Sequence, residues 1–389
     1  MIEWVFYMIF VMLGTVLGLF ASSYKQGRFL DIILSAFVAR ILGAVLFKRV
    51  VGVADIADYQ PYYVAFVDAL NSGRILSFLA EGVPVYTIIY PGWVFAVFGP
   101  KSYVLIRLFN AVLSVLVIVP LNMISEQVWD RELTRWQLVL VLFWPSYAIF
   151  SVDIGRTALG VILPIATLAL ALKYFQDTNR LTVLFVFLAV AVLNAANRIH
   201  YAFYLVMFVV GMYTYKSVYQ SSRRFGVGLM TITGSVSFIA IVVYNRLFIS
   251  VLSVDTIRDY AMSQATGGSV YLPELYPSSM VDLVWYLPIQ AFYFLFSPLP
   301  WDILQIGSPL AFIAGSQSIL LLLLLSSALL FRTDRITRDW RIFSLVVAVV
   351  LTAFGFGAVT KNAGAAVRWR LPSALILLVV TTNLLGRDE

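Results

Sequence analysis

Residues 308–331 read SPLAFIAGSQSILLLLLLSSALLF and contain no charged side chain. A transmembrane helix needs about 20 consecutive, mainly apolar residues to cross the hydrocarbon core of a bilayer. The stretch is long enough for that. It therefore predicts a helix that crosses a membrane.

The same kind of apolar run recurs along the whole chain of 389 residues, of which 61% are hydrophobic and 12% charged, with a mean hydropathy of +0.91. Soluble domains contain about 45–50% apolar and about 25% charged residues, so this composition excludes a soluble globular protein. We predict an all-α polytopic membrane protein in which residues 1–389 form a single transmembrane domain and no soluble domain is present. The eleven expected spans are 3–22, 29–47, 103–123, 137–152, 157–175, 181–196, 201–215, 226–249, 308–331, 342–360 and 369–386. Two further runs, 84–99 and 283–299, are short or broken by proline and are predicted to be re-entrant or interfacial.

The orientation follows from lysine and arginine, which gather in cytoplasmic loops of membrane proteins. The two most basic short loops, 216–224 and 332–341, are predicted to be cytoplasmic. Residues 48–83 then form the first external loop, and 250–307 form a long external loop or lid. We therefore expect a multi-pass protein of the plasma membrane whose site faces the outside or the periplasm.

The chain has no cysteine, which excludes a thiolate nucleophile and zinc or iron–sulfur sites ligated by cysteine. The net charge of +7 is modest, and we expect no nucleic-acid partner. A divalent metal at the two aspartates of the first external loop remains an open alternative, and no other cofactor is indicated.

The first external loop carries Asp55, Asp58, Tyr59 and Tyr62 close to the end of a predicted span. A carboxylate beside aromatic side chains at the membrane surface can act as a general base toward a hydroxyl group. The alternative is that Asp58 caps a helix that begins after Pro61, because aspartate is a preferred N-cap residue.

Two further groups of ionisable residues lie at the ends of predicted spans. Asp153 and Arg156 are three residues apart, so they either pair on a helix or contact a substrate. Arg198 and His200 lie in a short polar break, where an ionisable group at membrane depth costs about 2.5–3.5 kcal/mol and marks a candidate functional site. His200 is alternatively a hydrogen-bonded residue between helices.

Lys361 and Arg368 lie just before the last predicted span, and Arg370 lies at its start. Arginine offers planar, bidentate donors that match phosphate oxygens. The alternative role is anchoring at ordinary lipid headgroups. The segment 271–302, rich in aromatic residues and proline, is either an external lid that holds an isoprenoid tail or packing over the bundle.

These residues, taken in order, resemble the GT-C superfamily of integral-membrane glycosyltransferases, in particular prokaryotic members that use polyprenyl-phosphate sugars. The resemblance touches most of the chain through short motifs: Asp58, Tyr62, Ala65 or Ala69, and Gly73; Tyr90-Pro91, Phe98-Gly99 and Arg107 to Asn110; Trp144-Pro145, Ser151 and Asp153; Ser297 to Trp301; Asn362, Gly364, Arg368 and Arg370. The chain departs from that family's pattern because Asp55 and Asp58 are separated instead of adjacent, and because an extra span precedes the family's first helix.

The resemblance implies transfer of a sugar, with inversion, from a lipid-linked donor to an acceptor hydroxyl of a glycan, lipid or protein. It implies that Asp58 or Asp55 is the base and that the external cations hold the leaving phosphate. Two other functions are open. An O-antigen polymerase or ligase acting on polyprenyl-diphosphate glycans would rely on Arg198 and His200. A flippase or transporter of lipid-linked oligosaccharides would need cations along a path open to both sides.

Overall fold

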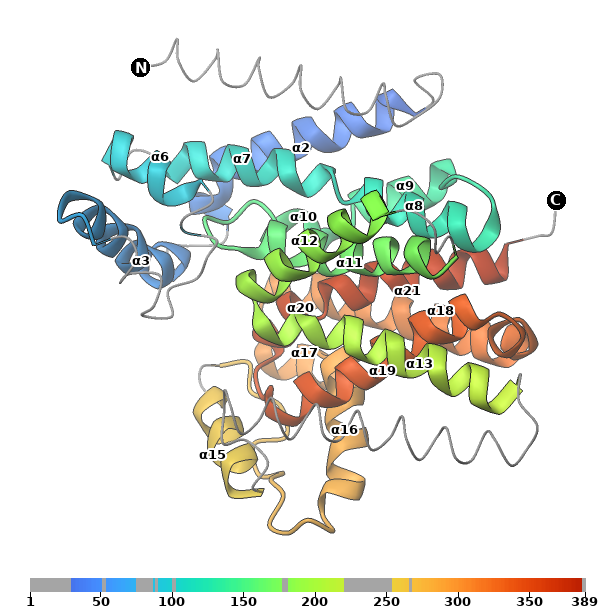
Figure 1. Cartoon of the computed structure of the whole chain (residues 1–389). Helices are drawn as coiled ribbons and strands as arrows, with labels where there is room; N and C mark the ends of the chain where they lie inside the picture. The colour runs from blue at the N-terminus through green and yellow to red at the C-terminus, as the bar shows by residue number, and fades with distance from the viewer. Residues whose placement is uncertain are drawn as a thin grey trace. The chain divides into compact units, whose positions relative to one another are not determined.

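The computed structural model describes residues 29–50, 54–74, 87, 90–99, 103–176, 181–219, 254–265 and 268–386. Among these residues every regular element is a helix, and one isolated antiparallel bridge joins Val270 to Asn362 (Figure 1). The elements are α2 (Leu30–Val50), α3 (Ala54–Asn71), α6 (Pro91–Phe98), α7 (Tyr103–Val115), α8 (Ile118–Trp129), α9 (Arg135–Leu142), α10 (Pro145–Phe150), α11 (Thr157–Gln176), α12 (Leu181–Asn197), η2 (Ile199–Tyr201), α13 (Ala202–Tyr219), α15 (Val254–Gln264), α16 (Leu283–Phe296), α17 (Pro300–Ile306), α18 (Pro309–Arg338), α19 (Trp340–Val359), α20 (Ala363–Trp369) and α21 (Leu371–Leu385).

Four stretches are long and apolar enough to cross a membrane: Tyr103–Trp129, Thr157–Gln176, Pro309–Arg338 and Trp340–Val359. A fifth forms if α20 and α21, which meet at an angle of 57°, count as one broken span. Helices α12, α13 and α16 are apolar but shorter. The predicted spans 3–22 and 226–249 lie outside the described residues. The structure thus confirms an all-helical, membrane-like chain in the part it describes.

The predicted span 137–152 is two helices, α9 and α10, each of which is much shorter than a bilayer crossing. Pro145 starts α10 and has no N–H to continue the helix before it. Arg40 of α2 is buried and donates to the carbonyl of Leu142, the last residue of α9, at 2.7 Å. A cation therefore stabilises the carbonyl end of the broken helix.

The chain divides into two compact units, Met1–Gln127 with Arg131–Ala202, and Val128–Asp130 with Phe203–Glu389. In the first unit α2 packs on α7, α9 and α10, and α11 packs on both α7 and α12 (Figure 1). Helix α3 packs on α6, with Tyr63, Phe95 and Tyr103 in a buried cluster that also includes Ile154. That cluster ties the irregular segment before α11 to three helices.

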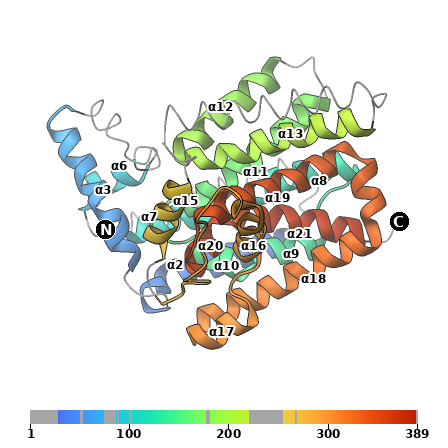
Figure 2. The same cartoon turned by 90° about the horizontal axis from the view of Figure 1, so that it is seen from below.

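In the second unit α16 packs along α19, and α18 packs along α21 (Figure 2). The rings of Phe294 and Phe356 stack with their centroids 5.4 Å apart. A Cβ on Gly357 would lie 2.6 Å from the carbonyl oxygen of Gln290, so the glycine permits this close backbone approach.

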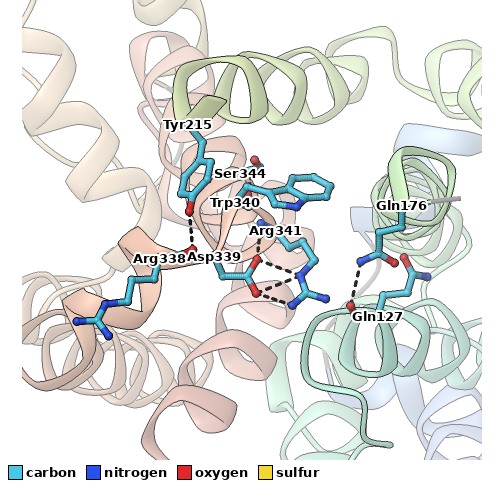
Figure 3. A network of polar contacts seen from close by, with 8 residues as sticks. All are labelled: Gln127, Gln176, Tyr215, Arg338, Asp339, Trp340, Arg341 and Ser344. Atoms are coloured by element: carbon cyan, nitrogen blue, oxygen red, sulfur yellow. Dashed lines mark hydrogen bonds and ion pairs between the residues drawn. The ribbon is translucent and has the colours of Figure 1, made fainter. Parts of the chain in front are cut away.

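The segment 332–341, predicted to be a loop, is helical up to Arg338, with a kink at Arg332. Only Asp339 separates α18 from α19, and its carboxylate caps α19 by accepting from the N–H of Arg341 at 2.8 Å. The same carboxylate pairs with the Arg341 guanidinium at 2.6 Å, and Tyr215 donates to the carbonyl of Arg338 (Figure 3). The turn between the helices is thus fixed by side chains and not by a long connection.

Helix α3 begins at Ala54 and includes Pro61, so Asp58 lies within the helix. The expectation that Asp58 caps a helix starting after Pro61 is therefore wrong. The inward face of α3 carries Tyr63 and Phe66, which are fully buried, whereas Tyr62 is 38% exposed.

Candidate functional site

The segment Ser151–Arg156 connects α10 to α11 in the first unit and is neither helix nor strand. Three consecutive carbonyls of this connection accept hydrogen bonds from side chains of other helices. The side-chain amide of Asn110 on α7 donates to Asp153 at 2.5 Å and to Gly155 at 3.1 Å, and the Tyr63 hydroxyl donates to Ile154. Irregular backbone inside an apolar protein requires such partners. They hold the backbone of Asp153–Gly155, which we call the platform.

Arg156 directly follows the platform, and Arg198 lies in the connection between α12 and η2. Arg156 donates to the carbonyl of Asn197 at 2.9 Å, which links the two connections. A Cβ added to Gly160 would lie 3.8 Å from Arg198 Nε and 3.9 Å from Asn197 Nδ2. Both side chains therefore lie against the first turn of α11, where the helix dipole favours negative charge.

Tyr59 of α3 also lies beside Arg156 and Arg198. An added Cβ on Gly155 would lie 2.5 Å from the Tyr59 ring, so only glycine admits the ring at this point of the platform. The Tyr59 side chain also interacts with the guanidinium groups of Arg156 and Arg198. The helix of the first predicted external loop thus meets both arginines.

The two guanidinium groups sit in different electrostatic surroundings. Burial lowers the pKa of Arg156, the charge of Arg198 lowers it further, and the net shift is downward despite Tyr59 and Tyr201. Burial also lowers the pKa of Arg198, but Tyr201, Tyr59 and Asp153 raise it, and the net shift is upward. Two like charges held together in a partly buried place favour an anion between them.

His200 lies in η2, two residues after Arg198. Its ring packs edge-to-face on the ring of Tyr201, with the two ring centroids 5.2 Å apart. Burial, followed by the charges of Arg198 and Arg156, lowers the pKa of His200 to about 3. The imidazole is therefore neutral at physiological pH and adds no third positive charge to the cluster.

Several buried polar atoms here have no hydrogen-bond partner among the described residues: Arg156 Nε, Arg198 Nε, Asn194 Oδ1, and both Nδ2 and Oδ1 of Asn197. Buried polar groups are nearly always satisfied, so a cluster of unsatisfied ones points to a bound polar group. Two guanidinium Nε donors and an amide N–H₂ suit the oxygens of a phosphate. We call Tyr59, Arg156, Asn197 and Arg198 the arginine site.

Asp153 and Arg156, expected to pair or to contact a substrate, are not on one helix. Asp153 is 2% exposed and accepts from the Gly155 N–H at 2.8 Å and from the Thr157 hydroxyl at 3.2 Å. Its carboxylate thus shapes the platform, while Arg156 donates to the carbonyl of Asn197.

The other expected cations, Lys361, Arg368 and Arg370, lie in the second unit. Arg370 is 4% exposed and donates to the carbonyl of Leu295 and to the Ser318 hydroxyl, each at 2.7 Å. Lys361 is fully buried and donates to the carbonyls of Leu272 and Leu275, below the ring of Tyr276. Arg368 is half-buried in the last turn of α20. Their phosphate-binding role stays a prediction.

Asp55 and Asp58 lie in the first turns of α3, but their side chains are outside the described part of the structure. Among the described residues no group of three or more histidine, aspartate or glutamate side chains can hold a metal ion. A metal at the two aspartates stays an open prediction.

Sequence reasoning did not assign roles to Asn110, Tyr63 or Asn197. A buried amide in an otherwise apolar helix was the available signal for Asn110, and the polar break after residue 193 contained Asn197. Neither signal says which distant carbonyl or cation the amide meets.

Comparison of the chain with protein-family models, with curated proteins and with solved structures gives no match.

Proposed function

We propose that this protein is a membrane-embedded glycosyltransferase that moves a sugar from a polyprenyl-phosphate donor to an acceptor hydroxyl. The observation that carries the proposal is the contact of Tyr59 with Arg156 and Arg198. It supports one site that combines two cations with the helix on which the candidate bases lie.

The arginine site supplies what departure of a lipid phosphate needs. A phosphate is already a good leaving group, so the reaction needs no general acid if cations stabilise the charge that develops on the phosphate oxygens. In our proposal Arg156 and Arg198 hold these oxygens through their unpartnered Nε donors, and the first turn of α11 adds its N–H groups.

The base in this proposal is a carboxylate of α3. Asp55 precedes Tyr59 by four residues, so the two positions share one face of the helix, and Asp58 occupies the neighbouring position. The carboxylate accepts the proton of the acceptor hydroxyl while the hydroxyl oxygen attacks the anomeric carbon. The bond from that carbon to the phosphate oxygen breaks on the opposite face, so the configuration of the carbon inverts.

The proposed setting is the outer face of the plasma membrane, with a glycan, lipid or protein as acceptor. The support is the placement of basic residues: Lys216 and the basic end of α18 suit the cytoplasmic side. If the chain crosses the membrane an odd number of times between these cytoplasmic residues and the arginine site, the arginine site lies on the outer side.

A second candidate is a polymerase or ligase that acts on polyprenyl-diphosphate glycans. The specific observation that favours it is the position of His200, which follows Arg198 and stays neutral beside two arginines. Its lowered pKa makes the imidazole a weak base, so in this candidate His200 would act as a neutral hydrogen-bonding partner of the substrate beside Arg198.

Sugar transfer by the purified protein tests the two candidates. Asp55→Asn, Asp58→Asn and His200→Gln should be compared using a polyprenyl-phosphate sugar and a polyprenyl-diphosphate glycan as donors. Loss of a general base lowers turnover by about 10²–10⁴-fold. With the monophosphate donor, we expect turnover to fall by this factor in either Asp55→Asn or Asp58→Asn, while His200→Gln stays active. Loss in His200→Gln alone, with the diphosphate donor, would establish the second candidate instead, and no transfer with either donor would contradict both.

A further inference from the structure

The platform Asp153–Gly155 is held by side chains that do not belong to the connection itself. Asn110 is fully buried in α7, and its amide spans two carbonyls of the platform. The Tyr90 hydroxyl donates to Asn110 Oδ1, so the amide is oriented with its N–H₂ toward the platform. An amide turned the other way would face carbonyls with its own oxygen.

Tyr63 holds the carbonyl between those two. Its ring is fully buried among Phe95, Tyr103 and Ile106, and its hydroxyl donates to Ile154. Tyr63 lies one turn after Tyr59 on α3, so one helix contributes both a contact with the arginines and a bond to the platform. The position of the platform is thereby coupled to the position of α3.

We propose that Asn110 and Tyr63 are positioning residues that fix the Asp153–Gly155 backbone and thereby aim Arg156 at Tyr59 and Arg198. Arg156 directly follows the three held carbonyls, so the plane of its preceding peptide is set by these bonds. The hold on the backbone stands by itself, and only the effect on ligand affinity rests on the proposed function.

The variant that tests this is Tyr63→Phe, which removes one hydroxyl and keeps the ring. Tyr147→Phe is its matched control. Tyr147 is fully buried in the same unit and donates to the carbonyl of Ser114 at 2.6 Å, outside the platform. Each variant loses one buried hydroxyl-to-carbonyl bond, so we expect similar losses of thermal stability.

The first readout is amide hydrogen exchange of the peptide covering residues 151–158, measured without any ligand. Loss of one such bond should raise local opening about fivefold in Tyr63→Phe and leave this peptide unchanged in Tyr147→Phe. Asn110→Leu, which removes both bonds to the platform and the acceptor of the Tyr90 hydroxyl, should raise it by more than about tenfold if it folds. Equal exchange of the peptide in Tyr63→Phe and Tyr147→Phe would overturn the proposal.

The second readout is the affinity for a short-chain isoprenyl phosphate. Affinity should fall about fivefold in Tyr63→Phe and stay at the wild-type value in Tyr147→Phe. If hydrogen exchange of the platform rises in Tyr63→Phe but the affinity is unchanged, the claim that the platform positions Arg156 for the ligand is contradicted. If the wild-type protein binds no isoprenyl phosphate, the proposed function fails, and hydrogen exchange alone decides whether Asn110 and Tyr63 hold the platform.

Discussion

Buried arginine side chains differ in this protein in how their donors are used. Arg370 donates from its terminal nitrogens to Leu295 and Ser318. Arg156 and Arg198 also donate from a terminal nitrogen, to Asn197 and Tyr201, and each retains a buried Nε without a partner among the described residues. Arg370 therefore braces the fold, whereas we propose that the Nε donors of Arg156 and Arg198 hold a ligand.

Changing Arg370 to glutamine should therefore act on stability. The variant leaves the carbonyls of Phe294 and Leu295 without their donor and should lower the free energy of unfolding by about 2–3 kcal/mol. Arg368→Gln, in the neighbouring turn, should cost less because Arg368 is only half-buried. Thermal unfolding of both in the same detergent measures this. Equal stability of the two variants, combined with loss of donor binding in both, would show that these arginines bind phosphate.

Lys361 gives a prediction on pH. Burial lowers the pKa of its ammonium from 10.5 to about 8. Between these values the unfolded chain binds the proton and the folded chain does not, so stability rises with pH across this window. Below pH 8 both states are charged and the cost of burying the charge is fully present. Lys361→Met should flatten the rise in melting temperature between pH 8 and 10, and an unchanged rise would assign it to other groups.

The sequence showed Arg156, Arg198 and His200 as candidates because an ionisable group beside an apolar run stands out by its cost in a membrane. It could not show that the Tyr59 ring lies on Gly155, since that contact depends on how α3 folds back. Nor could it show that Lys361 and Arg370 are engaged, because their partners are backbone carbonyls, which any residue carries.

At the scale of elements, helix ends follow local chemistry where that chemistry is strong. Pro145 ends α9, and Gly307, with its positive φ of 63°, separates α17 from α18. The prediction of a loop at the basic segment 332–341 is wrong because charge indicates exposure to water and not the end of a helix. It contains neither proline nor glycine, so α18 runs on to Arg338.

The junction of α18 and α19 makes a prediction at this scale. Asp339→Ala removes the cap of α19 and the pair with Arg341 and should cost about 1–2 kcal/mol of unfolding free energy. Asp339→Asn keeps a side-chain oxygen for the cap and should cost less than half of that. Asp334→Ala, on the exposed side of α18, is the control and should be neutral. If the asparagine variant is as unstable as the alanine variant, the ion pair matters more than the cap.

In the whole molecule, composition and the recurring long apolar runs sufficed to predict a helical, membrane-like chain, because a helix satisfies every backbone group of such a run within the run itself. The division into two compact units could not be predicted, since the polar stretch around residues 128–130 looks like any other loop between spans and no polar linker marks residues 202–203. The division depends on which apolar faces pack together, and all of these faces look alike in sequence.

The orientation can be tested with introduced cysteines, because the native chain has none. Gln60→Cys and Met280→Cys, both at exposed positions, should react with a membrane-impermeant thiol reagent in intact cells. Lys216→Cys and Thr333→Cys, also exposed, should react only after permeabilisation. Labelling at position 333 in intact cells, with none at position 60, would reverse the proposed orientation and place the arginine site in the cytoplasm.

The central claim is that the arginine site holds the phosphate of a lipid-linked donor. The most direct measurement is an experimental structure of the protein with a short-chain isoprenyl phosphate bound. We expect phosphate oxygens within hydrogen-bond distance of the Nε atoms of both Arg156 and Arg198, beside Tyr59 and the first turn of α11. A phosphate bound elsewhere, with both Nε atoms turned to other protein groups, would contradict it.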